Sequence, residues 1–126
     1  MNVPENLKYT SDHEWLKIEG DEAVVGITEY AQHELGDIVF VEVETVGEIL
    51  GKGEAFGTIE AVKTVSDMFM PVSGEVLSFN ENLITKPEIL NQDPYVSGWV
   101  VRIKINDPDE VESLLNAASY TKHTQA

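Results

Sequence analysis

The sequence contains no cysteine among its 126 residues. This absence excludes disulfide bonds, thiolate nucleophiles and zinc sites built on cysteine. Long apolar runs are also missing, because no stretch approaches the ~18 residues that a membrane-spanning helix needs. The first residues, MNVPENLKYT, show neither a basic segment followed by an apolar one nor an excess of arginine and serine. We therefore expect no secretory signal or transit peptide, and favour a bacterial-type cytosolic protein over a mature mitochondrial one.

Cationic residues are scarce, since 8 lysines and arginines stand against 23 acidic residues and the net charge is −15. The phosphates of nucleic acids and an acidic membrane surface would both be repelled, so we expect neither as a partner. Such a charge can steer the chain toward basic proteins, although solubility alone explains it equally well.

Short runs rich in β-branched residues, separated by glycine and proline, predict a series of strands. The length of these runs and the glycine and proline residues between them are typical of a mainly β sandwich or flattened barrel in a single domain of residues 1–126. The expected strands cover residues 14–19, 23–27, 38–43, 54–60, 65–70, 75–79 and 98–105.

Two helices are predicted among these strands. Thr28 can cap a helix over residues 28–35, which Gly36 would end. Asp107 can cap a second helix over residues 107–119, beyond which we expect a polar, frayed tail after about residue 120. Residues 82–98 are expected to form a loop with one short turn around Pro87.

Lys63 lies between two predicted strands, at or near the tip of a hairpin. A solvated lysine is a poor Schiff-base nucleophile, which needs desolvation or a neighbouring cation. The position suits a lysine that another enzyme modifies, but on the pattern alone a solubilising lysine at a hairpin tip is the favoured interpretation.

Three motifs lie around Lys63: EAVK at residues 60–63, SD at 66–67 and PVSGEV at 71–76. Together they resemble the lipoyl-lysine hairpin of the H proteins of the glycine cleavage system. Further motifs follow in the order of the family, from about Tyr9 to the final helix: YT at 9–10, HEW at 13–15, VGIT at 25–28, YAQ at 30–32, LGDIV at 35–39, then Asn80, Leu83, Pro87, Asn91, Pro94-Tyr95 and Gly98-Trp99. Ala61 departs from the family, which more often has serine there.

This resemblance implies a mainly β, hybrid barrel-sandwich fold of the lipoyl- and biotinyl-carrier type, with a short internal helix and a C-terminal helix. It implies a carrier with no catalytic centre of its own. Lipoate would be joined to Lys63 by a lipoyl-attaching enzyme, with Glu60 as a recognition residue. The arm would take the aminomethyl group of glycine from the P protein to the T protein, and the L protein would reoxidise it. We expect a monomer.

The resemblance also makes Glu14 and Asp67 candidates for contact with the loaded arm. The aminomethyl group carries a cationic amine, which a carboxylate lining a cleft can bind by a charge-assisted hydrogen bond. Each acid could equally be a solvated surface residue. His13 is predicted to be a structural histidine under the Trp15 ring, because no metal-ligand spacing accompanies it.

Other interpretations of Lys63 remain open. Biotin carriers share the fold type, but methionines flank their lysine, whereas Val62 and Thr64 flank Lys63. A relay that donates lipoate to other enzymes, an enzyme that uses Lys63 directly and an unmodified interaction module are further alternatives. Among architectural residues, we expect Gly53 and Gly74 in turns with positive φ, and Trp15 with Trp99 as core anchors.

Overall fold

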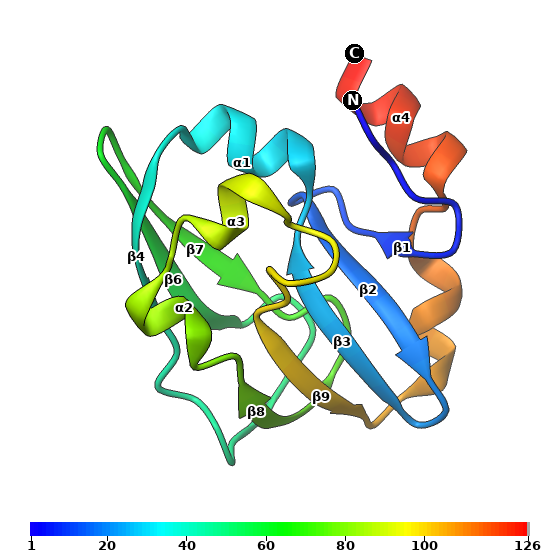
Figure 1. The fold of residues 1–126 in the computed structure, drawn as a ribbon. Coiled ribbons are helices and arrows are strands. Elements are labelled where there is room, and N and C mark those ends of the chain that lie inside the picture. The colour runs from blue at the N-terminus through cyan, green and yellow to red at the C-terminus, as the bar shows by residue number, and fades with distance from the viewer. Residues whose placement is uncertain (126) are drawn as a thin grey trace.

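Two antiparallel sheets form the body of the computed structural model, which describes residues 1–125 (Figure 1). The larger sheet has the order β1-β2-β3-β9-β8-β5 and the smaller one the order β4-β6-β7. The strands are β1 (Lys8–Tyr9), β2 (Glu14–Glu19), β3 (Glu22–Ile27), β4 (Ile38–Glu42), β5 (Ile49–Leu50), β6 (Ala55–Ala61), β7 (Val65–Phe69), β8 (Gly74–Phe79) and β9 (Val101–Ile105). The helices are α1 (Glu29–Leu35), α2 (Asn82–Thr85), α3 (Ile89–Gln92), the 3₁₀ helix η1 (Pro108–Ser113) and α4 (Ala117–Gln125).

The predicted fold class is confirmed. The described chain is mostly β, with a short internal helix and a C-terminal helix, and its two sheets do not close into a barrel. No helix between residues 1 and 125 combines the length and apolar character needed to cross a membrane.

The core lies between the sheets, where side chains of alternate strand positions meet. Val25 and Ile103 of the larger sheet and Phe56, Ile59 and Met68 of the smaller one are almost completely buried. Burial of this apolar surface is the main force that holds the two sheets together.

A second apolar cluster surrounds Trp15, which is buried as predicted. Its Nε1 donates a hydrogen bond to the Pro94 carbonyl at 2.9 Å. The ring lies directly over Gly26, where an added Cβ would come within 2.6 Å of it, so only glycine fits. Trp99 packs against this cluster but is only half-buried, so it is a weaker anchor than we expected.

Helix α1 begins and ends as its sequence indicates. Thr28 Oγ1 accepts a hydrogen bond from the Ala31 amide at 3.1 Å, which satisfies one of the free donors of the first turn. Gly36 follows with φ +78°, and its amide donates to the Gln32 carbonyl.

The predicted helix over residues 107–119 is wrong. Asp107 caps η1 as expected, but this helix ends at Ser113. Leu115 then exchanges two backbone hydrogen bonds of 2.8 Å with Tyr9 of β1, which holds the chain extended there. The chain becomes helical again in α4, which continues to Gln125.

Smaller differences concern residues 74 and 82–100. Helices α2 and α3 form on either side of Pro87, where we expected mostly loop, and β9 begins three residues later than predicted. Gly53 has the expected positive φ, but Gly74 lies within β8. Glycine is needed at position 74 because an added Cβ would approach the Lys104 carbonyl oxygen to 2.1 Å.

Candidate functional site

Lys63 is the middle residue of the three-residue loop that joins β6 and β7. The hairpin closes with the Ala61 amide donating to the Thr64 carbonyl at 2.7 Å. A second bond, from the Val62 amide to the Asp37 carbonyl at 3.0 Å, ties the loop to the residue before β4. The lysine is exposed, but its loop is held in place by the three paired strands β4, β6 and β7.

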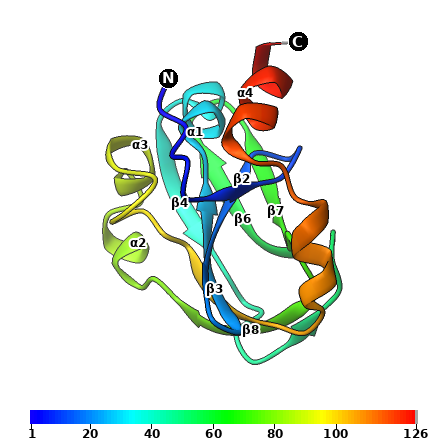
Figure 2. The ribbon, with the colours of Figure 1, turned by 90° about the vertical axis from the view of Figure 1, so that its right-hand side faces the viewer.

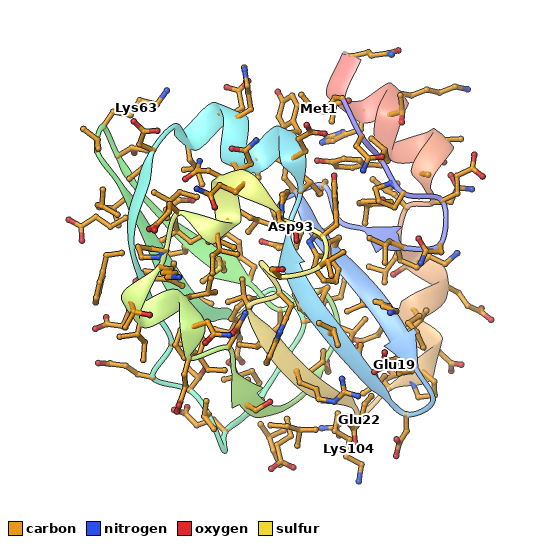
Figure 3. All side chains as sticks on the ribbon, in the orientation of Figure 1. Met1, Glu19, Glu22, Lys63, Asp93 and Lys104 are labelled. Carbon is orange, nitrogen blue, oxygen red and sulfur yellow. The ribbon has the colours of Figure 1, made fainter. Side chains whose placement is uncertain are left out.

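The Lys63 side chain lies beside the end of α1 (Figure 3). Its Cε is 3.5 Å from the position that a Cβ of Gly36 would occupy. Because Gly36 has no side chain, the stem of the lysine can rest on the backbone directly after Leu35. A group attached to Nζ would thus start next to α1.

A cavity of about 200 Å³, which we call the arm cleft, opens between α1, β7 and the turn before β2. Its apolar walls include Ile27, Leu35 and Met68, and its acidic residues include Glu14 and Asp67. The structure thus brings two of the predicted site residues together in one cavity, which lies beside the helix end that supports Lys63.

Glu14 is only 3% exposed and forms part of the inner wall of the arm cleft. Its Oε1 accepts a hydrogen bond from Thr10 Oγ1 at 2.8 Å, and its Oε2 accepts one from the Phe69 amide at 3.1 Å. Burial raises the pKa of Glu14 to about 7, and nearby Asp12 acts in the same direction, while the two hydrogen bonds act against the rise. This carboxyl can therefore exchange a proton near neutral pH.

Asp67 and Glu60 occupy different surroundings. Asp67 is exposed on β7 at the edge of the arm cleft, opposite Thr58 of β6. Glu60 lies near the end of β6, exposed and paired with Val65, and is not among the residues that line the cleft.

His13 also lines the arm cleft, but it does not pack under Trp15 as we predicted. Its ring lies against Tyr30 at a centroid distance of 4.6 Å, tilted by 33°, and its Nδ1 lies 2.8 Å from the Tyr120 hydroxyl. Burial lowers the pKa of His13, and His123 lowers it further, against the opposing effect of two nearby carboxylates. Sequence reasoning had no means of finding Tyr120, because the contact spans 107 residues of chain.

The cleft combines the features needed to hold a small cationic group at the end of a flexible chain. Apolar walls can exclude water, and Glu14 offers a carboxylate at the inner end. Within residues 1–125, no group of three or more acidic or histidine side chains is arranged to hold a metal ion. A charge-assisted hydrogen bond is the interaction that Glu14 offers a cationic ligand.

Comparisons with known proteins point to one family. The sequence profile of the family described as Glycine cleavage H-protein matches residues 7–126. A glycine cleavage system H protein of Bacteroides thetaiotaomicron is 58% identical over 120 residues, which are 95% of each chain. One from Halothermothrix orenii is 53% identical over 125 residues, covering 99% of this chain and 98% of its own.

A solved structure shows the same fold. The crystal structure of a glycine cleavage system H protein from Mycobacterium marinum superimposes with a TM-score of 0.89 at 37% identity, over 98% of this chain and 100% of that one. The agreement extends over nearly the whole length, from the N-terminal strands to the C-terminal helix. The chain therefore belongs to the glycine cleavage H-protein family.

Proposed function

We propose that this chain is the lipoyl carrier of a glycine cleavage system, with lipoate joined to Lys63 through an amide bond. The observation that carries the proposal is the exposed Lys63 on a fixed hairpin beside a cleft with a buried carboxylate. The lipoyl group, when attached, supplies a disulfide that receives the aminomethyl group of glycine. The carrier would visit the P protein, which loads the arm, the T protein, which unloads it, and the L protein, which reoxidises it.

The surroundings of Lys63 suit modification by another enzyme. Its loop neighbour Val62 is 75% exposed and Val65 is 63% exposed, so a lipoyl-attaching enzyme can approach the hairpin without unfolding it. Exposed apolar residues beside a modification site favour contact with a partner protein. Glu60, exposed three residues before the lysine, offers that enzyme a charge to recognise.

The chain's own residues would shelter the loaded arm. The stem of Lys63 rests on Gly36, next to the apolar wall formed by residues such as Leu35. Glu14 would accept a hydrogen bond from the cationic amine, and the arriving charge favours its ionised form. Asp67 at the edge would add a weaker, solvent-screened attraction. Exclusion of water by the cleft would slow hydrolysis of the aminomethyl group.

The attachment site is tested by intact-mass measurement of the protein expressed in cells that lipoylate their own carriers. We expect the added mass of one lipoyl group on the wild type and none on Lys63→Arg, which keeps the charge but cannot form the amide. Lys52→Arg is the matched control, because Lys52 is also exposed near a turn, and it should be modified like the wild type. A lipoyl mass on Lys63→Arg would overturn the assignment.

The arm contacts are tested by the rate at which the isolated, loaded carrier loses its aminomethyl group. Glu14→Gln should accelerate the loss by about tenfold, which is the factor that one buried charge-assisted hydrogen bond contributes. Asp67→Asn should change it by only about twofold, because the residue is exposed. Equal rates for Glu14→Gln and the wild type would show that Glu14 does not hold the loaded arm.

A further inference from the structure

The hydroxyl of Tyr120 joins two walls of the arm cleft from the far end of the chain. Tyr120 lies on α4 and is fully buried, and α4 lies near the same end of the molecule as α1 (Figure 2). The hydroxyl is 2.8 Å from Nδ1 of His13 and 2.7 Å from Oγ1 of Thr28. His13 lines the cleft, and Thr28 caps the helix that forms its outer wall.

The direction of these hydrogen bonds follows from counting protons. Thr28 Oγ1 already accepts from the Ala31 amide, and Thr28 is fully buried, so its own proton has only the Tyr120 oxygen as an acceptor among the described residues. Tyr120 must then donate its proton to Nδ1 of His13. The reverse direction would leave the buried Thr28 hydroxyl without an acceptor, which is costly.

The chain of hydrogen bonds therefore runs from Thr28 through Tyr120 to His13. It requires a neutral imidazole with its proton on Nε2, since Nδ1 acts as the acceptor. No other described residue provides a hydrogen-bond partner for Nε2, and the described side chains include no buried nitrogen without a partner, so Nε2 is accessible. The backbone fits a fixed role, because His13 is the one non-glycine among the described residues with positive φ, at 70°.

Several charged or titratable groups surround this imidazole. Tyr30 of α1 lies against it with a tilted ring, and His123 lies at a centroid distance of 5.6 Å on α4. Asp12 and Glu34 act on it from the preceding turn and from α1. The two carboxylates favour a cationic ring, whereas burial, His123 and the direction of the Tyr120 bond all favour a neutral one.

We propose that Tyr120 is a positioning residue of the arm cleft: its hydroxyl holds His13 as the Nε2–H tautomer and couples it to the N-terminal cap of α1. The C-terminal helix thereby fixes both the tautomer of a residue that lines the cleft and the position of α1, which forms its outer wall. The functional consequence rests on the proposed function, because it concerns shelter of the arm, whereas the tautomer is a property of the unmodified chain.

The first experiment is nitrogen NMR of the unmodified wild-type protein near neutral pH. We expect His13 to carry its proton on Nε2 and the Tyr120 hydroxyl proton to show a through-bond correlation with Nδ1 of His13. A proton found on Nδ1 of His13 would overturn the proposal, and this result depends on neither lipoate nor the folding of a variant.

The second experiment compares Tyr120→Phe with Tyr9→Phe. The two rings stack with their centroids 4.7 Å apart, and both residues are fully buried. The Tyr9 hydroxyl, however, donates to the Pro4 carbonyl and takes no part in the hydrogen bonds from Thr28 to His13. In Tyr120→Phe we expect the Nδ1 signal of His13 to lose its hydrogen-bond shift. The loaded arm should lose its aminomethyl group about fivefold faster, the factor that one net hydrogen bond contributes.

Tyr9→Phe should leave the His13 spectrum and the rate of loss unchanged. Equal rates of loss for Tyr120→Phe and Tyr9→Phe would overturn the positioning role. Failure of the proposed function would look different, since the wild-type carrier would then lose its aminomethyl group as fast as the free aminomethylated amide of reduced lipoate.

Discussion

Glu14 illustrates at the scale of a residue how the fold changes the chemistry of a common side chain. Only 3% of it is exposed, and its two oxygens are bound by Thr10 and by the Phe69 amide. Burial disfavours the charged form, so the proton is held up to about pH 7 instead of the ordinary 4.5. The native state therefore binds this proton more tightly than the unfolded chain does.

This difference predicts a pH-dependent cost in stability. The more favourable binding of this proton by the native state stabilises the fold fully below pH 4.5, and this stabilisation is lost as the pH rises through 7. The change amounts to roughly 3 kcal/mol in the free energy of unfolding of the wild type. Glu14→Gln lacks this titration, so its stability relative to the wild type should rise between about pH 5 and pH 8. Urea unfolding at several pH values measures it, and a constant difference between the two proteins would contradict the raised pKa.

The residues that could be predicted from the sequence are those with a local or family-specific signal. Lys63 stands out because cations are rare and it lies between two strand-like runs, and Glu14 and Asp67 follow from the resemblance. The roles of Thr10, the Phe69 amide and Tyr120 could not be predicted. They depend on distances between chain segments that only the packed sheets bring together.

At the scale of elements, the accuracy of the predictions follows the range of the forces involved. Helix α1 is correct because Thr28 and Gly36 act within one turn of its ends. The helix predicted over residues 107–119 was wrong because a long-range backbone pair overrides a regular apolar spacing. The two hydrogen bonds between Leu115 and Tyr9 extend the chain, and the Asn116 side chain then caps α4 by accepting from the Ser119 amide at 2.8 Å.

Helix α4 should contribute to stability, contrary to what a frayed tail would do. Ending the chain at Asn116 removes Tyr120 from its stack with Tyr9, and burial of such a ring is worth about 3–5 kcal/mol. We expect a lower melting temperature for the truncated chain by differential scanning calorimetry. Lys122→Ala, a change at an exposed position of the same helix, is the control and should melt like the wild type. An unchanged melting temperature after truncation would show that α4 does not hold the fold.

At the scale of the whole molecule, negative charges strongly outnumber positive ones. Of the few cations, Arg102 is bound between Glu19 and Glu22, at the opposite end of the molecule from Lys63 (Figure 3). Modification of Lys63 would remove one more positive charge, so the loaded carrier would be more acidic than the net −15 of the chain. Such a surface favours fast association with basic partner surfaces and loses that advantage in salt.

We accordingly expect the transfer of the aminomethyl group between carrier and partner enzymes to weaken with ionic strength. The value of kcat/KM for the carrier should fall by about tenfold or more between roughly 0.02 and 0.5 M salt. Steady-state assays with the purified P and T proteins measure this. The reaction of the reduced arm with an uncharged small disulfide serves as the reference and should not change. Salt-independent transfer would mean that steering by charge plays no part.

The hydrogen bond from the Phe69 amide to Glu14 connects the two sheets and so makes a backbone proton sensitive to the state of the cleft. An amide proton that donates to a carboxylate resonates at lower field than one that donates to a neutral acid. The Phe69 resonance should therefore move when Glu14 gains or loses its proton, or when an ammonium group arrives beside it. A single peak in a nitrogen–proton spectrum would then report how much of the carrier population is loaded, with no label on the arm itself.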